Sequence, residues 1–441
     1  MQKITAVIKS LIHRSFSALG YRLEPIPSYH PAAAETIGKR ARRLRRSSSG
    51  DHEPILRMAK AHLKGSTTSA DLPALGDRWG SYASELRSRI QFLSTVEEVI
   101  QLGQSPEAGI ETHFPRQELI GHCHCCDLEL LADLPSDLYA ALSSFRSPRI
   151  IRPDFVVEYR GRTVDFMTLL AARTVLTLLK LLPGNWPRTI CDIGGGTGSI
   201  ARCWLTNSAH RPDLIVIVDI PETLVFSETL LRSELGESQV QYLSSPTCTP
   251  KRSGVVLCPV TYIRKLENIS FDLVTNTTSM QEMTDEWVDW YMDWLDRQQC
   301  RFFWSANHFA NGLSNMREGH NSWSPRPSRR WQLLYSKVYL GPRNSAHMLF
   351  QRDTNATPDE GATVESRGVG AWLAFLEFAR CHQDELSLRR ALEFASSNLP
   401  FMPKETWQLG KMLFQITRSQ RDHELFKNLD QIRKAGNEAA H

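Results

Sequence analysis

The stretch TICDIGGGTGSIA, residues 189–201, decides the fold of this chain. An apolar run leads into a cluster of glycines, and the residues after the glycines have helical spacing. Glycine lets the backbone turn sharply and approach a ligand without a Cβ clash, beside the positive end of the following helix dipole. The stretch therefore predicts a strand, a tight turn and a helix whose first residues face a ligand.

Apolar strand-like runs alternate with helical patterns on both sides of this turn. The runs are RTICDI (188–193), LIVIVDI (214–220), VVLCPV (255–260), FDLVTNT (271–277) and CRFFWSAN (300–307). Alternation of this kind predicts an α/β fold with a mostly parallel, Rossmann-like sheet and right-handed crossovers. Two later runs, WQLLYSKVYL and AHMLFQR, flank the turn residues GPRN and predict an antiparallel hairpin at the sheet edge.

Composition and periodicity divide the chain into segments of different character. The α/β domain is flanked on both sides by segments with helical spacing. We expect an amphipathic helix in 1–37, a basic flexible linker in 38–52, a helical subdomain in 53–150, the α/β domain in 151–352, a linker in 353–367 and a helical accessory subdomain in 368–441. Within the α/β domain, residues 163–182 predict the first helix.

Two interpretations are open for each of the two basic N-terminal segments. A basic amphipathic helix either docks on its own protein or lies at a membrane surface. The run KRARRLRR, residues 39–46, is either a solvated linker or a tether to anionic lipid or nucleic acid. Peripheral membrane contact is therefore an alternative, and the pattern does not indicate an oligomeric state.

The overall composition is that of an ordinary globular protein. The 441 residues include 52 basic and 48 acidic side chains, so the formal net charge of +4 does not indicate a nucleic-acid-binding protein. No run reaches the roughly 20 apolar residues of a membrane span. The nine cysteines are scattered and odd in number, which favours reduced thiols and a cytoplasmic location.

The segment GHCHCCD, residues 121–127, has the side chains of a zinc site but not the spacing. Adjacent ligands do not easily surround a tetrahedral ion, and no second pair of cysteines or histidines follows nearby. We expect buried thiols here and no structural metal.

The glycine turn alone does not identify its ligand, because Gly196, Gly198 and Ala201 also fit the dinucleotide-binding pattern. Asp192 precedes the first glycine by two residues, where its carboxylate could meet the amino group of S-adenosylmethionine directly or through water. Asp219 ends the next strand, where a carboxylate can accept the ribose hydroxyls of either cofactor. These residues favour S-adenosylmethionine, and an NAD(P)-dependent oxidoreductase remains an alternative.

The segment FDLVTNTTSMQEM, residues 271–283, is a more specific signal than the glycine turn. Together with CDIGGGTG and VDIPET it resembles the sugar O-methyltransferase family of class I S-adenosylmethionine-dependent methyltransferases, whose members have a similar Asn-Thr-x-Ser-x-x-Glu-Met stretch. The resemblance covers about residues 150–352, and Thr275 stands where the family usually has an apolar residue.

The resemblance implies a class I methyltransferase core that transfers a methyl group to a hydroxyl of a sugar or glycan, free or linked to a nucleotide or lipid. S-adenosyl-L-methionine is the implied cofactor, and a divalent metal, which some relatives use, is a further alternative. A methyltransferase fold that has lost its activity and serves as a scaffold is a second alternative.

Methyl transfer to a hydroxyl needs in-line positioning of the acceptor and a general base. Glu282, just after the fourth core strand, is the first candidate base, and His308, after the fifth, is the second. The expected cofactor-binding residues are Asp192, Gly194, Gly195, Gly196, Gly198, Asp219, Ile220 and Asn276, and the expected acceptor-lining residues are Ser279 and Asn307. The helical spacing of Trp287, Trp290 and Trp294 indicates packing against the sheet.

Overall fold

The fold is taken from a computed structural model of the chain. It describes residues 53–64, 72–73, 77–104, 119–121, 123, 126, 130–131, 134–151, 155–159, 162–206, 210–298, 300–308, 331–339 and 345–352. The segments expected in 1–37, 38–52, 353–367 and 368–441 lie outside these residues.

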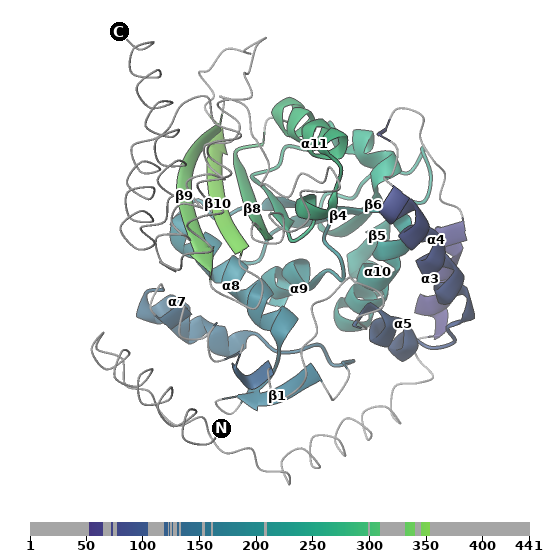
Figure 1. The fold of residues 1–441 in the computed structure, drawn as a ribbon, viewed down its shortest axis with the longest axis horizontal. Helices are drawn as coiled ribbons and strands as arrows, with labels where there is room; N and C mark the ends of the chain where they lie inside the picture. Colours follow the sequence, from purple (N-terminus) through teal and green to yellow (C-terminus); the bar gives the residue numbers. More distant parts are fainter. Residues whose placement is uncertain are drawn as a thin grey trace, which may run out of the picture. The chain divides into compact units, whose positions relative to one another are not determined.

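An eight-stranded sheet forms the centre of the described residues, in the order β5-β6-β4-β3-β7-β8-β10-β9 (Figure 1). Its strands are β3 (Thr189–Ile193), β4 (Leu214–Asp219), β5 (Val240–Tyr242), β6 (Gly254–Pro259), β7 (Leu273–Thr277), β8 (Phe302–His308), β9 (Trp331–Tyr339) and β10 (Ser345–Arg352). Neighbouring strands are parallel except at β10, which is antiparallel to both β8 and β9. The predicted mostly parallel, Rossmann-like sheet with an antiparallel edge hairpin is confirmed.

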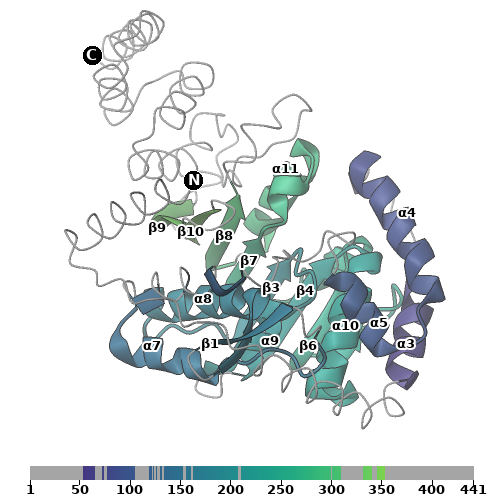
Figure 2. The same ribbon diagram turned by 60° about the horizontal axis from the view of Figure 1, so that its bottom comes forward.

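Helices cover both faces of this sheet. On β4, Ile215 and Ile217 pack in the cluster of α8 (Phe166–Leu181), α9 (Ser199–Thr206) and α10 (Pro221–Leu235). The alternate residues Val216 and Val218 face the other way, toward η6 (Val260–Leu266) and α11 (Asp285–Arg297). Side chains of a strand point alternately to the two faces, so β4 is buried on both sides, as a parallel strand requires. In Figure 2, α9 and α10 lie below β3 and α11 lies above it.

Among the described residues of 53–150, the structure has four helices and a short turn. The helices are α3 (Glu53–Lys64), α4 (Asp77–Phe92), α5 (Val96–Gly103) and α7 (Ser136–Ala141), followed by the short turn η2 (Leu142–Ser144). Leu86 and Ile90 of α4 share one apolar cluster with Val225 and Phe226 of α10. The N-terminal helices therefore pack directly on the α/β core.

The first helix of the core begins later than its apolar pattern predicts. Residues 162–165 form strand β2 (Arg162–Asp165), which pairs antiparallel with β1 (Val156–Tyr159). Asp165 then caps α8, because its carboxylate accepts a hydrogen bond from the Thr168 amide at 2.9 Å. A capping side chain at this position fixes the helix start at Phe166.

Among the described residues, no helix has both the length and the apolar character needed to cross a membrane.

Candidate functional site

The glycine turn that follows β3 needs glycine for two separate reasons. Gly194, Gly196 and Gly198 have φ angles of 67°, 56° and 81°, in the region that side chains other than glycine rarely adopt. A Cβ on Gly194 would also overlap Ser279 Oγ. The Gly194 amide donates to the Val218 carbonyl at 2.8 Å, which ties the turn to the end of β4.

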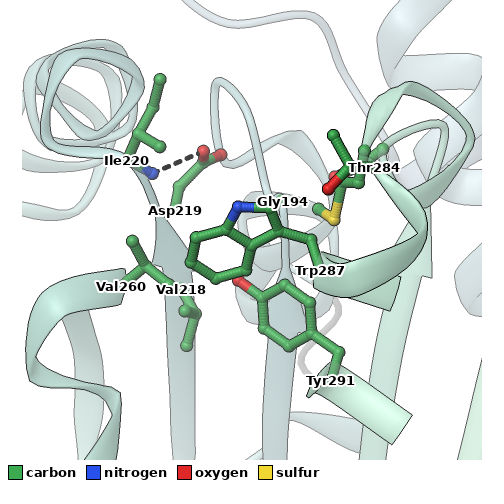
Figure 3. A pocket seen from close by; sticks show the side chains of 10 residues that line it. Gly194, Val218, Asp219, Ile220, Val260, Thr284, Trp287 and Tyr291 are labelled. Carbon is green, nitrogen blue, oxygen red and sulfur yellow. Dashed lines mark hydrogen bonds between the residues drawn. The ribbon is translucent and has the colours of Figure 1, made fainter. Parts of the chain in front are cut away.

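A pocket opens beside this turn, at the carboxyl ends of the parallel strands (Figure 3). It holds about 550 Å³ of empty space, including the part open to solvent. Its walls come from four strand ends and from α11: Gly194, Val218, Asp219, Ile220, Val260, Ser279, Met283, Thr284, Trp287 and Tyr291. Open α/β sheets bind their ligands at this edge.

Asp219 lies in the pocket wall with both carboxylate oxygens already hydrogen-bonded. Oδ1 accepts from the Ile220 amide at 2.8 Å and Oδ2 accepts from the Gly196 amide at 3.0 Å. Burial raises the pKa of Asp219 to about 7, with a smaller contribution from the negative charges of Asp192 and Glu222, although the two hydrogen bonds oppose the rise. Each oxygen keeps a second lone pair, so the carboxylate can still accept from a ligand hydroxyl.

Asp192 lies behind the turn rather than in the pocket wall. Its Oδ1 accepts a hydrogen bond from Thr275 Oγ1 at 2.7 Å, and its Oδ2 has no partner among the described residues. That second oxygen lies 2.9 Å from the place that a Cβ on Gly195 would occupy. Burial raises the pKa of Asp192 to about 7, although the hydrogen bond from Thr275 opposes the rise. Of the two routes expected from the sequence, this position favours contact with a ligand through water over direct contact.

Two buried asparagines hold the loop that follows β7. Asn276 Nδ2 donates to the Ile193 carbonyl at 2.9 Å, and its Oδ1 accepts from the Met280 amide and from Asn307 Nδ2 at 3.1 and 3.0 Å. Asn307 Oδ1 in turn accepts from the Ser279 amide at 3.2 Å. Both asparagines are fully buried, and neither lines the pocket. The structure therefore places them as supports of the pocket wall, and a ligand contact by either remains a prediction.

The same loop contains a strained residue. Thr278 has a φ of 54°, and its amide donates to the Ala306 carbonyl at 2.8 Å. A β-branched residue in this left-handed region costs free energy, and such strain is concentrated at ligand-binding loops. The strained turn leads into η7 (Met280–Glu282), directly after Ser279 in the pocket wall.

The two candidate bases lie at the expected edge of the sheet. Glu282 is the last residue of η7 and is half-buried, directly before two residues that line the pocket. His308 is the last residue of β8, and its side chain lies outside the described residues. The role of each as a general base remains a prediction.

Sequence reasoning missed the aromatic wall of the pocket. Trp294 is fully buried in the core, as expected, but Trp287 and Tyr291 line the pocket. Figure 3 shows their rings projecting from α11 into the pocket, toward the strand end that carries Asp219. Their spacing of four residues was the available signal, since it places both on one helix face near the carboxyl edge.

No cluster of metal ligands is found among the described residues. Cys123 and Cys126 are buried in the apolar cluster that also contains α8 residues. His122, His124 and Cys125 of the same segment lie outside the described residues.

Comparison with known proteins gives structural likenesses only. No protein family model matches the chain, and no curated protein matches it. The tRNA methyltransferase TrmK of B. subtilis is 10% identical, with a TM-score of 0.31 over 59% of this chain and 94% of its own. TrmK of M. capricolum, in complex with S-adenosyl-homocysteine, is 13% identical, with a TM-score of 0.28 over 56% of this chain and 90% of its own.

A third likeness is to the magnesium protoporphyrin IX methyltransferase of Synechocystis with bound SAH. It is 11% identical, with a TM-score of 0.29 over 42% of this chain and 82% of its own. Because all three TM-scores lie below 0.5, we base no inference on these likenesses.

Proposed function

We propose that the chain is an S-adenosylmethionine-dependent methyltransferase and that the pocket beside Gly194 and Asp219 binds the cofactor. One observation carries the proposal: the glycine turn after β3, the carboxylate at the end of β4 and the loop after β7 meet around one pocket. These are the three motifs on which the sequence resemblance rests.

The residues of the pocket fit the parts of this cofactor. Asp219 would accept the ribose hydroxyls, and the apolar side chains of Ile220 and Val260 would hold the adenine ring. The turn lies at the N-terminus of α9, where amides and the helix dipole favour the carboxylate of the methionine moiety. When bound, the cofactor supplies an electrophilic methyl group on a sulfonium.

The strand order argues against the dinucleotide alternative. In this sheet β10 is inserted antiparallel between β8 and β9, whereas the dinucleotide-binding fold keeps parallel strands in the order 3-2-1-4-5-6. Asp192 also has no assigned role in a dinucleotide site. The oxidoreductase therefore stays the weaker proposal.

The acceptor that we propose is a hydroxyl of a sugar or glycan. This finer proposal is supported by the resemblance of residues 271–283, which include Ser279 in the pocket wall. A neutral sugar hydroxyl is a poor nucleophile, so a base must take its proton as the oxygen attacks the methyl carbon in line. Glu282 and His308 are the candidates, and a divalent metal that lowers the pKa of the hydroxyl is the alternative.

Calorimetric titration of the purified full-length chain with S-adenosyl-L-homocysteine tests the cofactor, and Asp219→Ala should abolish the binding. Asp213→Ala is the matched control, because Asp213 directly precedes β4 at its opposite end and pairs with Arg188. Equal affinity in both variants would contradict the assignment of Asp219.

A screen of sugar and glycan acceptors with a labelled methyl donor then tests the acceptor. Glu282→Gln and His308→Ala distinguish the bases, because loss of the true base stops turnover and leaves cofactor binding intact. Cofactor binding without turnover on any acceptor would instead support the inactive scaffold.

A further inference from the structure

Two aromatic side chains of α11 form one wall of the proposed cofactor pocket. Trp287 and Tyr291 both line the pocket, and their ring centroids are 5.8 Å apart. Figure 3 shows the Tyr291 hydroxyl pointing into the pocket beside the Trp287 indole, toward Val218. Both rings belong to the apolar cluster that contains Val218 and Val260, so this aromatic wall faces the ends of β4 and β6.

The Tyr291 hydroxyl is a polar group in an otherwise apolar wall. Tyr291 is 3% exposed, and its hydroxyl has no hydrogen-bond partner among the described residues. A buried polar group without a partner costs free energy, and phenylalanine would fill the same space without that cost. The hydroxyl is therefore placed to bind a ligand in the pocket rather than to stabilise the fold.

The order of the strands indicates which part of the cofactor lies at this wall. The glycine turn follows β3, Asp219 ends β4 and Val260 follows β6, and these strands are neighbours in the order β6-β4-β3. In the proposed site the methionine moiety lies at the turn and the ribose at Asp219. The base and the sulfur are attached at opposite ends of the ribose, so the base lies beyond Asp219, at the ends of β4 and β6.

We propose that the aromatic wall is the nucleobase site of the pocket, with the Trp287 ring stacked on the base and the Tyr291 hydroxyl hydrogen-bonded to the edge of the base. The inference rests on the proposed cofactor, because it needs a base attached to a ribose at Asp219. It assigns ligand-binding residues to α11, which begins after the last of the three motifs that carry the proposed function.

The chemistry of a purine base fits this wall. Its faces are flat and apolar, and stacking on an aromatic ring stabilises them. Its edge has both hydrogen-bond donors and acceptors, and a phenol can serve as the partner of either. Burial raises the pKa of Tyr291 well above its usual value, with a smaller contribution from the charge of Asp219, so the phenol keeps its proton at neutral pH.

The test combines calorimetric titration of the full-length chain with S-adenosyl-L-homocysteine and urea denaturation of the same chain without ligand. Tyr291→Phe keeps the ring and removes only the hydroxyl. We expect it to weaken binding about tenfold. The urea midpoint should not fall, because the folded chain loses no hydrogen bond. A hydroxyl with a purely structural role would give the opposite results, a lower midpoint and unchanged binding.

Tyr242→Phe is the matched control for this variant. Tyr242 is also buried, and its hydroxyl oxygen likewise has no hydrogen-bond partner among the described residues. It belongs to the apolar cluster on the other face of the sheet and is not among the residues that line the pocket. We expect Tyr242→Phe to keep its urea midpoint and to bind like the unsubstituted chain.

A pair of variants at Trp287 tests the stacking. Trp287→Phe and Trp287→Leu both remove the indole, but only phenylalanine keeps a flat aromatic face. We expect Trp287→Leu to bind S-adenosyl-L-homocysteine about fivefold more weakly than Trp287→Phe, because only the phenyl ring can still stack on the base.

If Tyr291→Phe binds within twofold of the unsubstituted chain, or no more weakly than Tyr242→Phe, the hydrogen bond to the base is overturned while the proposed function stands. If the two Trp287 variants bind equally, the stacking is overturned. Failure of the unsubstituted chain to bind overturns both the inference and the proposed function.

Discussion

Replacing Asp192 with asparagine should stabilise the folded chain, and increasingly so as the pH rises. The folded protein holds the Asp192 proton more tightly than the unfolded chain, since burial raises its pKa from 3.8 to about 7. The unsubstituted chain therefore loses stability as the pH rises from about 4 to about 7. A shift of about three units corresponds to about 4 kcal/mol of unfolding free energy. Asparagine avoids this loss, and its side-chain oxygen can still accept from Thr275.

The assay is urea denaturation of the two proteins at pH 5, 6, 7 and 8. The gain in unfolding free energy of Asp192→Asn over the unsubstituted chain should grow through this range and level off above pH 7. A gain that does not change with pH would refute the reasoning, because it would mean that the pKa of Asp192 is not raised in the folded chain. The same variant should bind S-adenosyl-L-homocysteine more weakly, since it loses the charge behind the glycine turn.

Three further predictions concern the rest of the site. Gly194→Ala should abolish ligand binding and lower the unfolding free energy by about 2 kcal/mol or more in urea denaturation, because its Cβ overlaps Ser279 at a φ of 67°. Thr278→Gly should raise the unfolding free energy by about 1 kcal/mol in the same assay by removing left-handed strain. Affinity for S-adenosyl-L-homocysteine should fall as the pH drops below about 7, where Asp219 and Asp192 become protonated, and calorimetry across pH should show a smaller fall in Asp219→Asn, where only the charge of Asp192 is lost.

The sequence predicts the strand and helix order well, because the signals for these elements are local. The glycine turn between β3 and α9 and the edge hairpin of β9 and β10 each follow from a continuous stretch of sequence. Strand β2 is missed, because a four-residue strand depends on its partner β1 and the apolar pattern continues into α8.

The site was harder to predict, because it depends on where side chains point. Asn276 and Asn307 are at the expected edge, but both amides are used in holding the loop after β7. Trp287 and Trp294 share a helical face, yet only Trp287 is near enough to the carboxyl edge to line the pocket.

The most direct test of the central claim is parallel calorimetric titration of the full-length chain with S-adenosyl-L-homocysteine and with NAD. We predict binding of S-adenosyl-L-homocysteine, its loss in Asp219→Ala and no binding of NAD. Binding of NAD alone would contradict the proposed function and leave the fold unaffected.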